Sequence, residues 1–299
     1  MRLQRISGRD GIGAMRVSAL AAGTRAFSDG VSTGRMRHRL GIAGVILGTL
    51  ACSGSATGAA GQVPRLLLPD LDQRPPLAVA VRRGGPPNHH PLLVFTSSVE
   101  NVGYGPLLVE GHRATLSART MRATQLVQVR GGGVRRIDGV GRLRYNVNPS
   151  HSHWHLQPFE RYELRTLDGT QIVRDRKSGF CLTSDHQSSL PTQGHAASRP
   201  LQGSDCARNK RRAERLLEGI GVGWGDIYIP AKEGQSIDLA GYTPGEYDLV
   251  HRVNVGRVLR ETSYANDASS LRIRLTAPAT PGGLPGVVVL RTCETGVGC

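Results

Sequence analysis

The sequence predicts a mainly β protein, an antiparallel β-sandwich with long loops and one or two short helices. Three observations predict this class. Short apolar runs alternate with turn residues from Pro64 onward. Glycine (39) and proline (17) are abundant among the 299 residues, which favours short strands joined by turns over long helices. Aromatic residues make up only 4%, so the core must consist mainly of Leu, Val and Ile.

Six segments have the apolar pattern and the turn punctuation of strands. They are residues 92–98, 105–110, 125–129, 161–166, 247–255 and 270–275. The Pro-Gly pair at 244–245 is a turn signal before the fifth segment. A helix is expected over residues 208–218, where Ala213, Leu216 and Leu217 have helical spacing. Short strands with one short helix are typical of a sandwich.

The N-terminal region has the pattern of an export signal. Arginines precede the apolar run of residues 41–51, and small residues follow it. The run is shorter than the roughly 20 residues that a transmembrane helix needs. We therefore expect a signal peptide over residues 36–61, an upstream extension from an early start over residues 1–35, and no transmembrane helix in the mature protein. Cys52 resembles the lipid-attachment site of bacterial lipoproteins, and cleavage near residues 59–60 is the alternative.

The cysteines also fit an exported protein. Removal or lipidation of Cys52 leaves four cysteines, which allow three pairings. The short separation of Cys293 and Cys299 predicts one bond in a C-terminal tail, and Cys181–Cys206 would then link the middle of the domain. Such bonds are typical of an oxidising compartment, so the protein is expected to be secreted or associated with the cell envelope. The Pro/Gly-rich residues 278–299 are expected to be that loosely attached tail.

The chain is strongly basic, with a formal net charge of +15. Residues 1–60 hold eight Arg and two Asp, which leaves +9 for the rest. The basic residues form no stripe with interleaved aromatics and no nucleic-acid module, so we expect no nucleic-acid partner. An arginine-rich soluble surface is the prediction, with acidic envelope polymers as the partners that such a surface would suit.

The strongest chemical signal is the triplet His151, His153 and His155. Alternate residues of a strand face one side, so the three imidazoles would point the same way. Successive Cα atoms would lie about 6.7 Å apart, within reach of one ion on a bent strand. Neutral imidazole suits Zn, Cu, Fe and Ni. The triplet alone predicts a metal site, while a three-His zinc hydrolase, another β-fold metalloenzyme such as a cupin and a fortuitous surface cluster remain open.

The triplet lies in the first of three segments that together resemble the lysyl oxidase family. Residues 151–182 read HSHWHLQPFERYELRTLDGTQIVRDRKSGFCL and resemble its copper-binding region, where HxHxH precedes a Tyr-acidic-Leu strand and Lys-x-x-Phe-Cys-Leu. Residues 219–247, GIGVGWGDIYIPAKEGQSIDLAGYTPGEY, resemble the stretch with Asp-x-Tyr, Ile-Asp-Ile and Pro-Gly-x-Tyr. Residues 259–267, LRETSYAND, resemble the calcium-binding turn, and Pro-Asp-Leu at 69–71 resembles the domain start. The resemblance covers residues 65–277.

The resemblance implies a lysyl oxidase-like catalytic domain, which we place at residues 62–277. It implies copper at the histidine triplet and a lysine tyrosylquinone cofactor formed from Lys177 and Tyr228. Lys177 is one of only three lysines among 38 basic residues, which agrees with a specific role. A quinone carbonyl is an electrophile that no standard side chain provides, and a general base must remove the α-proton of the amine. Asp226 is the candidate base, with a structural hydrogen-bond acceptor as the alternative.

The sequence departs from the family pattern in its cysteines. Ser150 stands where the animal enzymes have a cysteine before the triplet, and Trp224 and Gly234 replace two cysteines that flank the quinone tyrosine. Both members of that pair are replaced, so no orphan thiol remains. The resemblance places Cys181 and Cys206 in two different family disulfides, so their pairing with each other is a prediction of its own.

The resemblance also implies a calcium site. Its candidate ligands are Asp70, Leu71, Glu261, Ser263, Asn266 and Asp267. Ser263 stands where the family has an acidic residue, which should weaken the site. An ordinary polar turn is the alternative interpretation of residues 259–267.

The expected activity is the copper-dependent oxidative deamination of primary amines, peptidyl lysine among them. Molecular oxygen would be consumed, and aldehyde, ammonia and hydrogen peroxide would be released. A charge of +9 disfavours a polycationic substrate within a Debye length of about 8–10 Å, so a small amine or a lysine in an acidic context is preferred. The alternatives are a non-catalytic exported β-sandwich that binds copper and calcium, and a zinc hydrolase that uses the same triplet.

Overall fold

The computed structural model describes residues 65–147, 152–175, 177, 179–201, 205–232 and 234–299. All of them belong to the compact unit Ala59–Cys299. The expected extension, signal peptide and lipid-attachment cysteine lie outside the described residues. So do His151, the first histidine of the triplet, and Ser150.

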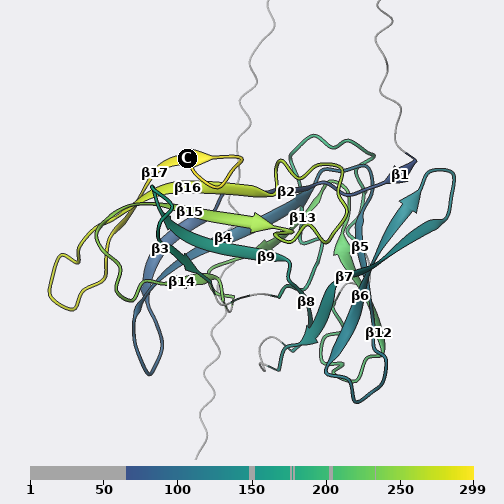
Figure 1. The fold of residues 1–299 in the computed structure, drawn as a ribbon, viewed down its shortest axis with the longest axis horizontal. Helices are drawn as coiled ribbons and strands as arrows, with labels where there is room; N and C mark the ends of the chain where they lie inside the picture. Colours follow the sequence, from purple (N-terminus) through teal and green to yellow (C-terminus); the bar gives the residue numbers. More distant parts are fainter. Residues whose placement is uncertain (1–64, 148–151, 176, 178, 202–204, 233) are drawn as a thin grey trace, which may run out of the picture. The chain divides into compact units, whose positions relative to one another are not determined.

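The described residues form three antiparallel sheets (Figure 1). The first has the order β12-β5-β6-β7-β8, with β1 beside β6. Its strands are β1 (Leu66–Leu67), β5 (Leu107–His112), β6 (Thr120–Val129), β7 (Val134–Tyr145), β8 (Trp154–Gln157) and β12 (Arg215–Ile220). The second has the order β10-β9-β15-β16-β17. Its strands are β9 (Glu160–Thr166), β10 (Ile172–Arg174), β15 (Gly245–Val253), β16 (Ala268–Leu275) and β17 (Val287–Cys293).

The third sheet is built on the long strand β4, with the order β11-β13-β4-β14 and with β2 and β3 also paired to β4. Its strands are β2 (Leu71–Gln73), β3 (Leu77–Arg83), β4 (Pro91–Asn101), β11 (His186–Gln187), β13 (Trp224–Tyr228) and β14 (Ser236–Asp238). Nine consecutive residues of β4 are buried. A strand covered on both faces needs such continuous burial rather than strict alternation.

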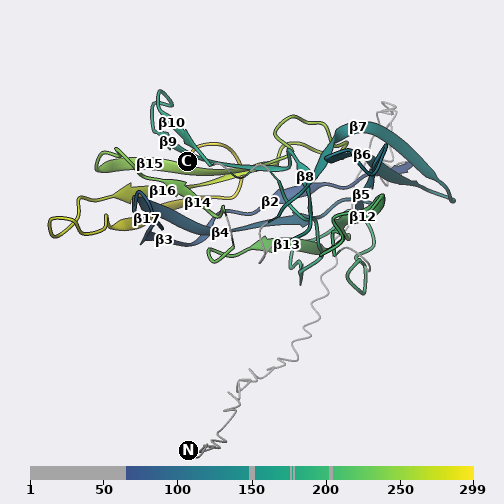
Figure 2. The same cartoon turned by 90° about the horizontal axis from the view of Figure 1, so that it is seen from below.

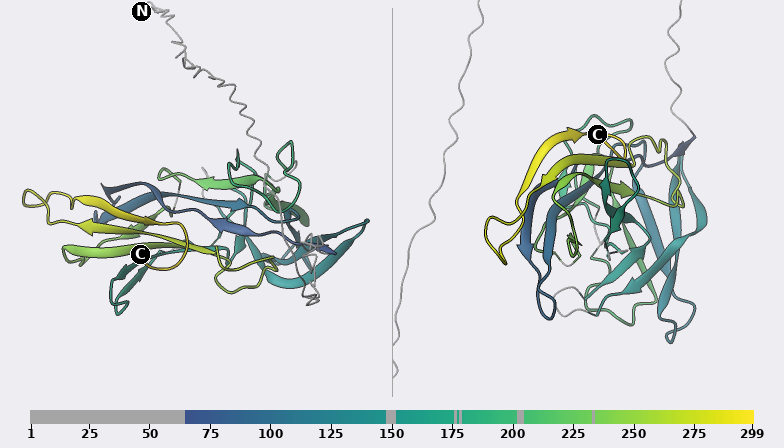
Figure 3. Two further views of the ribbon diagram at one scale, coloured as in Figure 1. Left: turned by 90° about the horizontal axis from the view of Figure 1, so that it is seen from above. Right: turned by 60° about the vertical axis from the view of Figure 1, so that its left-hand side comes forward.

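The second and third sheets lie face to face, and the first sheet lies beyond one end of this pair (Figures 2 and 3). Phe95 of β4 meets Tyr162 of β9 and His251 of β15, with ring centroids 4.8 and 4.6 Å apart. All three side chains are buried. Aromatic pairs of this kind contribute about 0.5–1.5 kcal/mol beyond their area. These aromatic contacts therefore join the two layers close to the residues of the candidate site.

The predicted mainly β, antiparallel class is confirmed, and each of the six predicted strands overlaps an observed one. The helix expected over residues 208–218 is wrong, because the described residues contain no helix and this segment leads into β12. Leu217 is exposed while Glu218 is buried, and β12 pairs with β5. These leucines therefore lie on a paired strand, and they do not form the buried face of a helix. The segment expected as a loose tail, residues 278–299, supplies the edge strand β17.

Candidate active site

Two histidines of the triplet lie side by side at the start of β8. His153 and His155 are buried, and their ring centroids are 4.8 Å apart. Trp154 between them packs edge-on against Tyr145 at 5.5 Å, and the guanidinium of Arg113 lies 5.0 Å from its ring. Because successive side chains of a strand point to opposite faces, Trp154 points away from the side that carries His153 and His155. Two adjacent imidazoles in a buried site could hold a transition-metal ion, and Zn, Cu, Fe and Ni all suit such ligands.

Lys177 and Tyr228 are 51 positions apart and meet in the fold. The Nζ of Lys177 lies 4.0 Å from the ring centroid of Tyr228 and 4.4 Å from that of Phe180. The Tyr228 hydroxyl donates a 2.7 Å hydrogen bond to the carbonyl of Cys181, and its ring packs edge-on against Phe180 at 5.0 Å. Among the described residues, the buried Nζ of Lys177 has no hydrogen-bond partner. The amine is therefore directed at the ring rather than held elsewhere.

The surroundings of Lys177 make its neutral form more accessible than that of a solvent-exposed lysine. Burial lowers the pKa of Lys177 to about 8, against the carboxyls of Glu160 and Asp226, which raise it. The charge of Lys232 lowers it further. An amine is nucleophilic only when it is neutral, and desolvation of a cation is what shifts its pKa downward. Burial, with the nearby carboxyl of Asp226, raises the pKa of Tyr228 well above its usual value.

Gly234 gives Lys177 the room that it occupies. A Cβ at this position would lie 2.8 Å from the Cβ of Lys177 and 2.9 Å from its Cδ. The backbone there has a φ of 78°, a conformation that favours glycine. The family pattern has a cysteine at this position. In this chain, its replacement by glycine is required by the close approach of the lysine stem.

Asp226 lies two residues before Tyr228 on β13, so strand alternation puts both on one face. Its carboxyl is buried and accepts a 3.1 Å hydrogen bond from the Thr183 hydroxyl. Its other oxygen, Oδ2, has no hydrogen-bond partner among the described residues. Burial, with repulsion from Asp185 and Glu160, raises the pKa of Asp226 well above its usual value. A carboxyl with these properties suits proton transfer near neutral pH.

Two residues near the site were missed from the sequence. Glu160 of β9 is fully buried, accepts a 2.6 Å hydrogen bond from Tyr162 and lies close to Ser97. Burial raises the pKa of Glu160 to about 7. Lys232 places its Nζ 4.8 Å from the ring centroid of Tyr228. The scarcity of lysine was the signal that could have identified Lys232. Glu160 lies in a segment with several other charged residues, so nothing in the sequence distinguishes it from a surface residue.

A family model described as lysyl oxidase matches residues 109–280, more than half of the chain. The chain belongs to the lysyl oxidase family.

The curated relatives that this family member resembles share only low sequence identity with it. It is 27% identical over 139 residues to lysyl oxidase homolog 2 of Xenopus laevis, which is 45% of this chain and 16% of that protein. It is 26% identical over 135 residues to lysyl oxidase homolog 2 of Homo sapiens, again 45% of this chain and 16% of that protein. The match to lysyl oxidase homolog 3A of Danio rerio is 25% identical and covers 63% of this chain and 20% of that protein. The chain thus spans a fifth or less of these relatives.

Two disulfides are present in this family member, as predicted. Cys181 bonds to Cys206, and Cys293 bonds to Cys299. The first bond lies inside the candidate site, because the carbonyl of Cys206 accepts a 2.9 Å hydrogen bond from the backbone N–H of Trp154. Structural disulfides are typical of extracellular proteins. Among the residues described, no helix is long and apolar enough to cross a membrane.

Four of the six candidate calcium ligands come together in this lysyl oxidase family member. Glu261 accepts a 2.7 Å hydrogen bond from the Leu71 backbone, and Asn266 donates one of 2.9 Å to Asp70. Burial and the charge of Asp70 raise the pKa of Asp267 to about 7. Burial, with the charge of Asp267, raises the pKa of Glu261 well above its usual value. A hard cation bound near carboxyls that raise one another's pKa would stabilise their charged forms.

The remaining two candidates play different parts. Leu71 offers only its backbone, and its N–H is the group that Glu261 binds. The Ser263 hydroxyl accepts a 3.1 Å hydrogen bond from the N–H of Ala265 and so belongs to a local turn. Asp70, Glu261, Asn266 and Asp267 therefore form the side-chain part of the cluster.

Proposed function

We propose that the protein is a copper-dependent amine oxidase that converts primary amines to aldehydes with release of ammonia and hydrogen peroxide. In this proposal Lys177 and Tyr228 form a lysine tyrosylquinone cofactor, and His151, His153 and His155 hold copper. The observation that carries it is the 4.0 Å approach of the Lys177 Nζ to the Tyr228 ring centroid. A buried amine without a hydrogen-bond partner is costly, and cross-linking to the ring would remove that cost.

The residues of this chain would divide the work. When formed, the cofactor supplies an electrophilic carbonyl and copper supplies the oxygen chemistry. Asp226 would take the α-proton of the amine at Oδ2, the oxygen that is free among the described residues. Its burial makes the carboxylate a stronger base than a solvated one. Phe180 packs edge-on against the Tyr228 ring at 5.0 Å and would help to hold the ring in place.

The decisive experiment measures peroxide. The full chain, expressed with its own N-terminus and loaded with copper in air, should release peroxide from an alkylamine and react with a carbonyl reagent. The same protein loaded with zinc should do neither, because zinc has no redox chemistry. Peroxide-free turnover of an ester or amide by the zinc form would instead identify a hydrolase. Copper binding without carbonyl labelling or peroxide would identify a non-catalytic copper-binding module.

The substrate class follows from the charge of the domain. The net charge of +9 outside residues 1–60 repels polycationic partners over about 8–10 Å at physiological salt. We propose a small primary amine, or a peptidyl lysine with acidic neighbours, as the substrate. Export through the segment at residues 36–61 would place the enzyme outside the cytoplasm, released after cleavage near residues 59–60 or, as the alternative, held at the cell envelope by lipid attachment at Cys52.

We also propose that calcium binds at Asp70, Glu261, Asn266 and Asp267. Saturating calcium should stabilise the metal-free protein by about 2–3 kcal/mol at 100 times its Kd, which is a rise in Tm of about 5–10 °C for a domain of this size. Thermal unfolding with and without calcium measures this.

Asp267→Asn should remove most of the gain, because it takes a charged ligand from the cluster. Ser263→Ala is the matched control in the same turn and should keep the gain. An equal calcium response in wild-type and Asp267→Asn protein would rule out this site.

A further inference from the structure

A row of basic side chains crosses the outer face of the first sheet. The register pairs Arg215 of β12 with His112 of β5, His112 with Arg122 of β6, and Arg122 with Arg142 of β7. Residues directly opposite each other in an antiparallel ladder point to the same face. At about 4.8 Å between neighbouring strands, the row is about 14 Å long. All four side chains are exposed.

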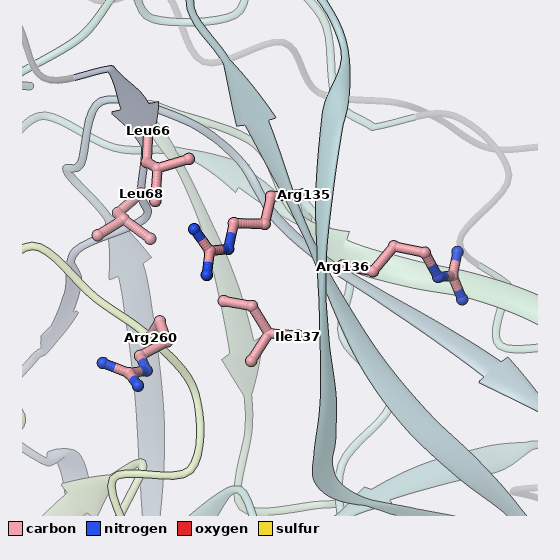
Figure 4. A pocket seen from close by; sticks show the side chains of 6 residues that line it. All are labelled: Leu66, Leu68, Arg135, Arg136, Ile137 and Arg260. Carbon is pink, nitrogen blue, oxygen red and sulfur yellow. The ribbon is translucent and has the colours of Figure 1, made fainter.

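The same face carries two further arginines on β7, Arg136 and Arg144, at positions with the parity of Arg142. Figure 4 shows the Arg136 side chain on the opposite side of β7 from Arg135 and Ile137. A hollow of about 700 Å³ opens on the outer face, lined among others by His112, Arg122, Arg136 and Arg215. Three of the four residues of the row, His112, Arg122 and Arg215, therefore line a recessed surface.

The charges on this face are poorly balanced. On the four strands β5, β6, β7 and β12, five outward arginines face two outward acids, Glu110 and Asp138. Glu110 is paired with Arg136, and Asp138 accepts a 2.7 Å hydrogen bond from Thr124. Among the described residues, no ion pair involves the other four arginines, which are Arg122, Arg142, Arg144 and Arg215.

Such an arrangement has a cost that a ligand would offset. Like charges directly opposite each other in a sheet are destabilising, and Arg122 lies directly opposite Arg142. Guanidinium groups bind carboxylate, phosphate and sulfate with two parallel hydrogen bonds. An extended anion along the row would neutralise the repulsion and satisfy several guanidinium groups together.

We propose that this face binds a linear acidic polysaccharide laid across β12, β5, β6 and β7. The row supplies anion-binding groups at the spacing of neighbouring strands, which suits an extended chain with repeated charges. A single-stranded nucleic acid fits less well, because its bases need aromatic stacking platforms. On these strands the sole aromatic residue is Tyr145, which packs against Trp154. This inference goes beyond the proposed oxidase activity and does not depend on it.

A second hollow lies on the other side of β7. Its volume is about 350 Å³, and its lining residues are Leu66, Leu68, Arg135, Ile137 and Arg260, with Arg136 of the outer face also bordering it (Figure 4). Among the described residues, the guanidinium groups of Arg135 and Arg260 have no ion-pair partner, and they lie beside apolar side chains in this hollow. It lacks the repeated register of the outer row, so the polysaccharide is assigned to the outer face.

The test is a binding titration with defined oligosaccharides. The probes are an oligogalacturonate, its uncharged methyl ester, a sulfated oligosaccharide and a single-stranded oligonucleotide of equal charge. At about 0.15 M salt, the metal-free wild-type protein should bind an acidic oligosaccharide, with affinity that falls steeply as salt is raised. The galacturonate and sulfate arms show which anion is preferred. The methyl ester should not bind.

Two double variants decide whether the row is the site. Arg122→Gln/Arg142→Gln should weaken binding by about tenfold or more and reduce the salt slope by about two. Arg82→Gln/Arg291→Gln removes the same charge from exposed positions on β3 and β17 and should change affinity by less than about twofold. Thermal unfolding should show that neither variant is destabilised, because the row variant removes a like-charge contact.

Three outcomes would overturn the proposal. The first is no binding of either acidic oligosaccharide by the wild type at that salt concentration. The second is an equal loss of affinity in both double variants, which would show that binding depends only on the net charge of the protein. The third is tighter binding of the oligonucleotide with the same sensitivity to Arg122 and Arg142, which would assign the face to nucleic acid.

Discussion

Tyr228→Phe is expected to abolish amine oxidation, with a loss of roughly a thousandfold or more, because phenylalanine cannot be converted to a quinone electrophile by the same chemistry. Lys177→Arg is expected to have the same effect, since a guanidinium stays protonated and is not a nucleophile. Both variants should keep copper, because the two described histidines of the triplet lie at the start of β8, apart from Lys177 and from Tyr228 on β13. Removing the hydroxyl costs the 2.7 Å hydrogen bond to Cys181, or about 1 kcal/mol. Peroxide release and copper content measure the two effects.

Lys232→Arg is the matched control. Its Nζ also lies over the Tyr228 ring, at 4.8 Å against 4.0 Å for Lys177. The shorter approach and the buried Nζ of Lys177 lead us to expect the link at Lys177, so Lys232→Arg should retain activity. Peptide mass mapping should find the peptide with Lys177 joined to the peptide with Tyr228. A link between Lys232 and Tyr228 would contradict the assignment of the lysine, and an unmodified Tyr228 after copper exposure would contradict the cofactor itself.

Cys181→Ser/Cys206→Ser is expected to lower the stability of the metal-free protein by about 3 kcal/mol, because the bond closes a loop with a sequence separation of 25. For a domain of this size the loss corresponds to about 6–12 °C in Tm. Chemical denaturation of the wild-type protein and of the double variant at the same pH measures this loss of stability.

The second disulfide provides the comparison. Cys293 and Cys299 are separated by 6 positions, so their replacement should cost about 1 kcal/mol less by loop entropy. It lies at the exposed edge strand β17, far in sequence from Lys177, so activity should be kept. Equal losses of stability and activity in the two double variants would contradict a special role for the Cys181–Cys206 bond.

The strands were predictable where their patterning was apolar. β4, β9, β15 and β16 carry such patterns, and the prediction found each of them. β7 was missed because it holds four arginines and two glycines, a composition that local propensity reads as a loop. The segment of β12 was predicted as part of a helix because Leu216 and Leu217 have helical spacing with Ala213. Short apolar runs fit a helix or a strand, and the pairing with β5 shows that this one is a strand.

The site was predictable as a set of residues but not as an arrangement. Family motifs pointed to Lys177 and Tyr228 without showing that the amine lies over the ring. That contact depends on Gly234 and on the Phe180 ring, which are tertiary features. Glu160 could not be found, because burial of its carboxylate follows from the packing of β9 against the opposite sheet. His151 lies outside the described residues, so its part in the metal site stays a prediction.

The Cys181–Cys206 bond has a consequence for the order in which the protein matures. The carbonyl of Cys181 holds the Tyr228 hydroxyl, and the carbonyl of Cys206 holds the backbone of Trp154 between the two described histidines. One covalent joint therefore sets both the ring to be oxidised and the strand that would carry the metal. If the proposed cofactor forms, closing this bond before metal uptake would favour it, because the bond ties together the two segments that carry these carbonyls. The oxidising compartment that closes the bond would thus also time the onset of activity.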